Sequence, residues 1–238
     1  MHIVAHRGYN GKYPEQTPLA FEKALELPIH GVECDVRMTK DGKLVVHHDS
    51  TMDRTSNISG RVSRMDWADI RGADIGDEEH GVQHPLLLEE LIEMVAPTGR
   101  HLYIETKHPS CFGTEVEEQV ALRLRYAGLL DDPHFHLISF SHRAVRTMLT
   151  LAPAMDCIYL RRDWERRFNR HDVMLSRPSG LGMSLVRAKL WPGGIGKQGL
   201  PTYLWTVDDP EDVAWAQAQG VDILATNEPE VALQALGG

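Results

Sequence analysis

The chain has 238 residues, of which 42% are hydrophobic and 25% charged, which is enough material for one large globular domain with a sizeable core. Its formal net charge of −9 disfavours broad nucleic-acid binding and docking on anionic membranes, because an acidic surface repels phosphate groups. The number of cysteines is odd and they are widely scattered, which excludes a disulfide framework: Cys34, Cys111 and Cys157.

No targeting segment is recognisable at the N-terminus. No basic stretch leads into an apolar one after Met1, and no run of about 18 apolar residues occurs along the chain. We therefore expect a cytoplasmic protein with no stable membrane insertion. The sequence does not indicate an oligomeric state.

Short β-branched runs alternate with amphipathic stretches from the N-terminus onward. We expect a first strand at residues 2–5 and a first helix at 18–27, with Thr17 as its cap and Pro18 in its first turn. Strands at 31–36 and 44–47 follow. The alternation then breaks.

Residues 49–85 are polar and rich in Gly, Ser, Asp and Arg, with Trp67 among them. We interpret this segment as an insertion within a single domain that spans residues 1–238, and not as a second domain.

The alternation resumes after the insertion. Asp209 is placed to cap a helix whose first turn holds Pro210, and residues 191–199 have the composition of a glycine-rich loop. The expected helices are 86–95, 115–126, 143–151, 211–219 and 229–236, and the expected strands are 101–107, 135–139, 155–160, 182–185, 203–207 and 221–225.

About eight strands are thus each followed by a helix or a helix-length segment, which predicts a parallel sheet. At this length eight units favour a single closed (β/α)8 TIM-type barrel over an open sheet. Catalytic residues of such barrels lie where the strands end, so the C-terminal ends of the strands are the places to examine.

Charged residues cluster at two of these ends. Glu33 and Asp35 are two residues apart in one strand and therefore share a face, as do Glu105 and Lys107 in a later strand. Two carboxylates facing the barrel interior need a cation, and a third from Glu105 suits Mg²⁺ or Ca²⁺ better than zinc. Carboxylates on a solvent-facing strand and a structural Glu–Lys pair are the alternative interpretations.

Two histidines also follow strands. His6 precedes Arg7 and Gly8 directly after the first strand, and an imidazole next to a guanidinium can supply proton transfer and phosphate binding. His48 is a second candidate acid or base, although the adjacent His47 competes with it on the residues alone.

These motifs together resemble the glycerophosphodiester phosphodiesterase family, and they follow the family's order over nearly the whole chain. They are His6-Arg7-Gly8, Pro14-Glu15-Gln16-Thr17, Glu33-Cys34-Asp35-Val36, Thr39-Lys40-Asp41-Gly42, His48-Asp49, Arg54-Thr55, Ile104-Glu105-Thr106-Lys107, Ser139-Phe140, Trp205-Thr206-Val207-Asp208 and Thr226-Asn227-Glu228-Pro229. Two positions depart from the family pattern, namely Gln16 in place of the usual asparagine and Asn227 in place of a common aspartate. These departures bear on fine geometry and substrate preference.

The resemblance implies a barrel with a short polar insertion after its second strand, and it implies a role for each candidate residue. The cation ligands are Glu33, Asp35 and Glu105; the acid–base pair is His6 and His48; the phosphate contacts are Arg7 and Lys107; and the alcohol side of the pocket is lined by Phe140 and Trp205.

The implied reaction is metal-dependent hydrolysis of a small-molecule glycerophosphodiester to glycerol 3-phosphate and an alcohol. Which histidine is the base, and whether water or the glycerol hydroxyl attacks, stays open. A lysophospholipase D-like enzyme is the main alternative, with an apolar entrance formed by the 191–199 loop and the insertion. A phosphosugar isomerase or aldolase barrel and a non-catalytic phosphodiester-binding barrel are the others.

Overall fold

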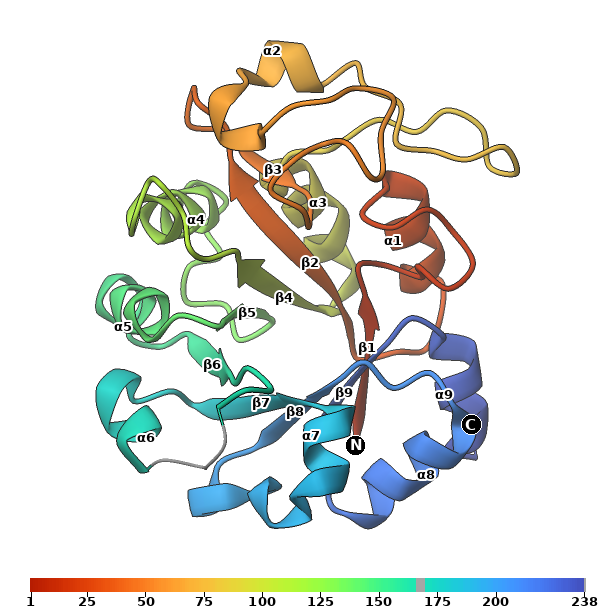
Figure 1. Cartoon of the computed structure of the whole chain (residues 1–238), viewed down its shortest axis with the longest axis vertical. Helices are drawn as coiled ribbons and strands as arrows, with labels where there is room; N and C mark the ends of the chain where they lie inside the picture. The colour runs from red at the N-terminus through yellow and green to blue at the C-terminus, as the bar shows by residue number, and fades with distance from the viewer. Residues whose placement is uncertain (166–169, 238) are drawn as a thin grey trace.

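Eight parallel strands close into a barrel in this computed structural model, which describes residues 1–165 and 170–237 (Figure 1). Closure is completed by β1, which pairs with β2 on one side and with β9 on the other. The strands are β1 (His2–His6), β2 (Gly31–Met38), β4 (His101–Thr106), β5 (Phe135–Ser139), β6 (Asp156–Leu160), β7 (Gly180–Ser184), β8 (Thr202–Trp205) and β9 (Ile223–Thr226). The predicted TIM-type barrel is confirmed.

One further strand lies outside the parallel ring. β3 (Leu44–Val46) pairs antiparallel with the end of β2, and the segment between β3 and α3 (Leu88–Val95) lies beside them, with the short helix α2 (Trp67–Ile70) at the top of Figure 1. A small apolar cluster anchors this segment by joining Val45 and Leu87 to Met52, Val62 and Ile70.

The helices form the outer layer, and several begin at side-chain caps. Thr17 accepts a hydrogen bond from Ala20 N at the start of α1, and Asp209 accepts one from Glu211 N at the start of α8, as expected from sequence. The outer helices are α1 (Pro18–Leu25), α3, α4 (Glu115–Tyr126), α5 (His142–Leu151), α6 (Arg170–Ser176), α7 (Leu185–Leu190), α8 (Pro210–Ala218) and α9 (Pro229–Ala235). No helix in the described parts of the chain is long and apolar enough to span a bilayer.

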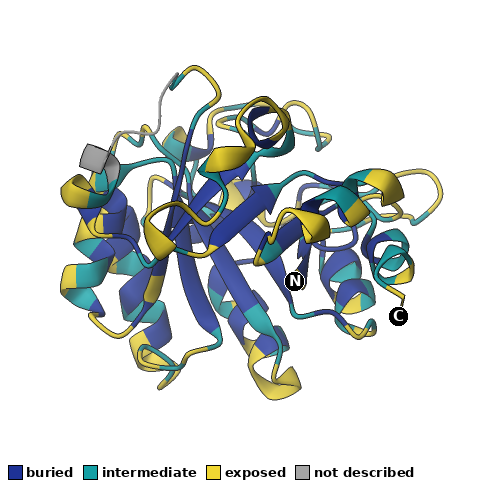
Figure 2. Cartoon of the chain, turned by 90° about the horizontal axis from the view of Figure 1, so that it is seen from below, coloured by how far each residue is buried: buried dark blue, intermediate teal, exposed yellow. Residues whose placement is uncertain are grey.

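Two apolar layers hold the barrel together. The larger one lies between the strands and the helices, and the smaller one fills the barrel interior with side chains such as Val4, Tyr103, Leu160 and Tyr203. In Figure 2 the strands are dark blue over most of their length, whereas the helices are blue on their inner faces and yellow on their outer ones.

Two predicted strands start two residues away from the observed ones: β9 begins at Ile223 and not at residue 221, and β7 begins earlier than predicted. The sequence predicts a strand at residues 182–185, whereas β7 spans Gly180–Ser184. A side chain at Gly182 would come within 2.5 Å of Leu160 and 2.7 Å of Trp205, so the barrel interior requires glycine there. The sequence pattern does not predict the helices α6 and α7, and the 191–199 loop contains two short 3-10 turns.

A group of histidines occupies the opposite, N-terminal end of the barrel, where the strands begin. Its rings stack on one another, with centroids 4.0 Å apart for His2 and His30 and 3.8 Å for His30 and His101. His101 Nδ1 lies 2.7 Å from His136 Nε2 in a hydrogen bond between the two rings. His134, whose imidazole contacts the Asp132 carboxylate, completes the group.

Protonation of this histidine group is suppressed in the folded protein. Burial, together with the charges that neighbouring imidazoles would carry, lowers the pKa of His30 to about 3, of His101 to about 4 and of His136 to about 3. Arg100 lowers the pKa of His30 further, whereas Asp132 and Asp156 act in the opposite direction on His101.

We predict that these histidines make the protein sensitive to acid. An unfolded histidine titrates near pH 6.5, so between about pH 6.5 and 4 the unfolded chain binds protons that the folded one excludes. The free energy of unfolding should therefore fall as pH falls, by about 1.4 kcal/mol per pH unit for each histidine that stays neutral. Urea denaturation at pH 7, 6, 5 and 4 measures the slope.

The variant His136→Phe keeps the stacked contact with Tyr103 but cannot be protonated, and should reduce that slope by about one histidine's contribution. His80→Gln, in the insertion, is the matched control. Equal slopes in wild type and His136→Phe would contradict the prediction.

Candidate active site

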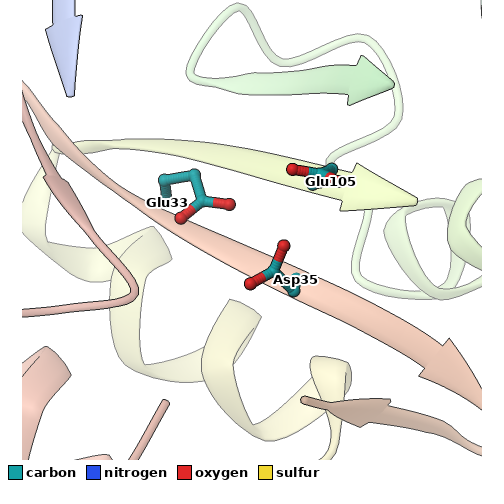
Figure 3. A group of neighbouring side chains, drawn as sticks. All are labelled: Glu33, Asp35 and Glu105. Atoms are coloured by element: carbon teal, nitrogen blue, oxygen red, sulfur yellow. The ribbon is translucent and has the colours of Figure 1, made fainter. Parts of the chain in front are cut away.

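Three carboxylates from two neighbouring strands meet at the C-terminal end of the barrel. Glu33 and Asp35 lie on β2, Glu105 lies on β4, and the register pairs Asp35 with Glu105. One oxygen from each lies within 4.8 Å of the other two, and Figure 3 shows the carboxylates facing a common space. Their exposed fractions are 1%, 1% and 7%. The period of two places Glu33 and Asp35 on one face of β2, and the register between β2 and β4 brings Glu105 beside them.

Burial makes this carboxylate cluster electrostatically costly. Burial, and then the charges of Asp35 and Glu105, raise the pKa of Glu33 well above its ordinary value, and burial raises the pKa of Glu105 to about 7. Burial also opposes ionisation of Asp35, but Lys107 and Arg7 outweigh it and hold the pKa of Asp35 below its usual range.

The cluster fits a hard divalent cation. Glu33 Oε1 is buried without a hydrogen-bond partner, which is the state expected of an oxygen that ligates an ion. The donors are all carboxylate oxygens, with no histidine nitrogen or cysteine sulfur among them, and this set favours Mg²⁺ or Ca²⁺ over zinc.

Arg7 is held over the cluster by a strained turn. Its φ of 60° is in the left-handed region, and its backbone N–H donates to Glu33 Oε2 over 3.0 Å. Its Nε lies 3.2 Å from Asp35 Oδ2. Gly8 continues the turn at φ 77°, where a Cβ would come within 2.7 Å of the Ala20 backbone. The turn that Gly8 permits thus aims a guanidinium at the site.

Lys107 and Gln16 contact the same carboxylates. Lys107 Nζ lies 2.8 Å from Asp35 Oδ1 and 2.7 Å from Glu105 Oε1. Gln16 Nε2 donates to Asp35 Oδ2 over 2.6 Å, from a residue whose own φ is 61°. Gln16, one of the two departures from the family pattern, is therefore in direct contact with a candidate ligand.

His6 is oriented by a neutral amide. Its Nδ1 lies 2.8 Å from Asn227 Oδ1, and its Nε2 lies 4.0 Å from Glu33 Oε2. The Asn227 amide has only one orientation, because its Nδ2 donates to the Asp208 carboxylate over 2.8 Å. His6 Nδ1 therefore carries the proton and donates it to Asn227, which leaves a lone pair on Nε2. Burial, and then Arg7, lower the pKa of His6 to about 4.

His48 is oriented by a carboxylate instead. Its Nδ1 donates to Asp49 Oδ1 over 2.7 Å, and Asp49 Oδ2 accepts a hydrogen bond from Arg54 Nε. Arg54 in turn binds Glu15, which also accepts a hydrogen bond from Arg7. Burial is the main cause that lowers the pKa of His48.

The structure separates His48 from the neighbouring His47. His47 is buried, and its Nε2 contacts the Thr51 carbonyl oxygen at 2.9 Å, away from the carboxylates. His48 lines a cavity of about 570 Å³ together with Glu105 and Lys107.

That cavity extends from the carboxylates toward the ends of β5, β6 and β8. Phe140 and Trp205 line it as an edge-to-face pair with ring centroids 5.5 Å apart. Its remaining lining residues are Arg37, His108, Arg161, Arg162, Asp163 and Trp164. The lining comes from strand ends and the loops after them, and not from the insertion or the 191–199 loop.

All nine predicted site residues lie around this C-terminal end, and the structure adds several that the sequence does not single out. Arg37 has a signal, because it follows Asp35 by two residues in β2 and so shares its face. Arg162 has none, because it lies in a loop beyond β6, where no periodicity fixes the direction of a side chain.

Comparison with known proteins gives a consistent result. The Glycerophosphoryl diester phosphodiesterase family pattern matches residues 6–231. The chain is 33% identical over 245 residues to a Mycobacterium tuberculosis protein named "Probable glycerophosphodiester phosphodiesterase 1". This alignment covers 95% of this chain and 89% of that protein. It is 29% identical to a glycerophosphodiester phosphodiesterase of Caldanaerobacter subterraneus, with 96% and 94% covered.

Solved structures agree on the fold. A phosphodiesterase of Oleispira antarctica, solved in complex with the product sn-glycerol-3-phosphate, superimposes with a TM-score of 0.91 over 100% of this chain and 97% of that one, at 23% identity. A glycerophosphodiester phosphodiesterase of Agrobacterium tumefaciens gives a TM-score of 0.82 at 25% identity, with 98% and 99% covered.

We predict that Mg²⁺ or Ca²⁺ stabilises the folded protein through the carboxylate cluster. A cation at about a hundred times its Kd adds about 2.7 kcal/mol, which is roughly 5–10 °C in Tm for a domain of this size. Thermal melts with and without each cation measure the shift.

Glu33→Gln keeps the side-chain shape but removes one charge, so it should lose most of that shift without destabilising the cation-free protein. Glu93→Gln, exposed on α3, is the control and should respond like wild type. Equal cation shifts in Glu33→Gln and wild type would refute the assignment of Glu33.

Proposed function

The chain belongs to the glycerophosphodiester phosphodiesterase family, and from this we propose that it hydrolyses glycerophosphodiesters to glycerol 3-phosphate and an alcohol by a metal-dependent mechanism with two histidines. The observation that carries the proposal is the buried meeting of Glu33, Asp35 and Glu105, flanked by His6 and His48. A divalent cation held by such a cluster would attract a substrate that carries a negative charge.

The proposed cation ligands are the three carboxylates. A divalent cation held by them would polarise a phosphoryl oxygen and screen the charge of the diester from the nucleophile. Lys107 and Arg7 contact Asp35, and a cation held by the carboxylates would leave both side chains available to the phosphate oxygens. We assign both to phosphate binding and charge stabilisation in the transition state.

The two histidines have different partners, and this difference supports different roles. His6 donates to the neutral amide of Asn227, which leaves an unprotonated Nε2 that can take the proton from the attacking hydroxyl. His48 is held by the Asp49 carboxylate, which raises the pKa of His48 against the lowering by burial, and the negative charge of a bound diester would raise that pKa further. We therefore assign His6 as the general base and His48 as the general acid that protonates the departing alcohol.

We predict that leaving-group reactivity separates the two roles. His6→Ala and His48→Ala should each lower kcat on glycerophosphocholine by about 10²–10⁴-fold, because each removes one proton transfer. On a glycerophosphodiester of p-nitrophenol, whose phenolate departs without a proton, His48→Ala should recover most of its activity and His6→Ala should not.

The adjacent His47 provides a matched control, and His47→Gln should retain turnover on both substrates. Recovery by His6→Ala instead of His48→Ala would reverse the assignment. Near-normal turnover in both alanine variants, or in wild type treated with a chelator, would remove the mechanism altogether.

A further inference from the structure

The cavity beside the carboxylates contains more positive charge than the proposed reaction uses. Lys107 is occupied by Asp35 and Glu105, and Arg161 Nε lies 3.6 Å from Glu165 Oε2. Two further guanidiniums, those of Arg37 and Arg162, line the same cavity.

Neither of these two guanidiniums has a carboxylate partner within 4.0 Å among the described residues. Arg37 Nε donates to the His48 carbonyl oxygen over 2.8 Å, and Arg162 Nη1 donates to the Phe140 carbonyl oxygen over 3.0 Å. Each of these bonds uses one of the five donors of a guanidinium, so donors remain for a ligand. Asp35, Asp49 and Glu105 favour the charge of Arg37 from longer range, without an ion pair.

The cavity is also lined by two acids, Glu105 and Asp163, of which Glu105 is paired with Lys107 and Asp163 accepts a hydrogen bond from the Ser184 hydroxyl. Four basic side chains line it as well, so its lining has an excess of positive charge: Arg37, Lys107, Arg161 and Arg162.

Two of the aromatic side chains that line the cavity, Phe140 and Trp164, already contact a cation. The Arg162 guanidinium lies 5.4 Å from the centroid of Phe140 and 5.6 Å from that of Trp164, within the range of cation–π contact. A quaternary ammonium group would have to displace Arg162 from these rings, and would also meet the charge of Arg37. An anionic group would instead find donors already in place.

We propose, on the basis of the proposed function, that this cavity selects glycerophosphodiesters whose leaving alcohol carries a negative charge, such as a carboxylate or a second phosphodiester. Arg162 binds the anionic group, Phe140 and Trp164 hold its guanidinium in position, and Arg37 adds charge from the β2 side. Cationic head groups are disfavoured at the same cavity.

The test compares three soluble diesters in a glycerol 3-phosphate release assay. Their leaving alcohols are positive in glycerophosphocholine, neutral in glycerophosphoglycerol and negative in bis(glycerophospho)glycerol, whose rate is divided by two for its two equivalent bonds. Wild type should prefer the negative over the positive substrate by about tenfold or more in kcat/KM, as expected for hydrogen bonds to a charged group.

Arg162→Gln should reduce that ratio about tenfold, and Arg162→Lys, which keeps the charge but not the planar fork, should reduce it less. Arg64→Gln removes an exposed arginine of the insertion and should leave the ratio unchanged, which controls for net charge. Circular dichroism spectra establish that each variant is folded.

The outcomes separate the two levels of the proposal. Hydrolysis of all three diesters without a preference, or an unchanged ratio in folded Arg162→Gln, overturns the head-group selection and leaves the phosphodiesterase function intact. No release from any diester overturns the function, and the selection with it.

Discussion

The burial of three carboxylates side by side is the constraint on which the rest of this end of the barrel depends. Each of Glu33, Asp35 and Glu105 is nearly excluded from solvent, and their charges would repel one another strongly in a medium of low dielectric. The surrounding side chains reduce this repulsion in part. Arg7 and Lys107 supply positive charge, and Gln16 supplies a hydrogen bond, all directed at Asp35, which is consequently the one carboxylate whose pKa is held low. Glu33 keeps an oxygen without a partner, so the protein alone does not complete the arrangement. A group of this kind is a cost to stability that a functional site tolerates.

Strained backbone conformations at this end of the barrel also cost stability. Arg7 and Gln16 both adopt left-handed φ values that residues with side chains rarely take, and both reach the carboxylate cluster from the loop between β1 and α1. That loop is fixed because Gly8 packs against Ala20 of α1 and because Thr17 caps the same helix. The first strand–loop–helix unit therefore delivers a guanidinium, a carboxamide and His6 to one place. Barrel closure is what makes this possible, since the pairing of β1 with β2 sets His6 opposite Glu33.

The sequence predicts the barrel and the main groups of the site because both depend on periodicity. Strand–helix alternation predicts a parallel sheet. Residues two apart in a strand share a face, so their spacing alone predicts that Glu33 and Asp35 point the same way. Features that depend on contacts between distant segments cannot be found in this way. The choice between His47 and His48 depends on the direction of each ring, and the roles of the histidines depend on partners as remote as Asn227. The predicted start of β7 is two residues late, because the pairing of Gly180 and Leu181 with β6 leaves no signal in the spacing of residues along the chain.

The two ends of the barrel show why buried ionisable groups have different consequences. At the N-terminal end the imidazoles of His30, His101 and His136 stack on one another, with Asp156 only at the edge of the group, 4.0 Å from His136. They can do so because a histidine can be buried in its neutral form at neutral pH for a small cost in free energy. At the C-terminal end a carboxylate has no such option, since remaining neutral at pH 7 requires a pKa raised by several units, as burial and its neighbours do for Glu33. Stacked histidines therefore lower the stability of the protein only when the pH falls. Clustered carboxylates favour the binding of a cation already at neutral pH. The same chemical difference distinguishes the histidine group at one end of the strands from the candidate cation site at the other.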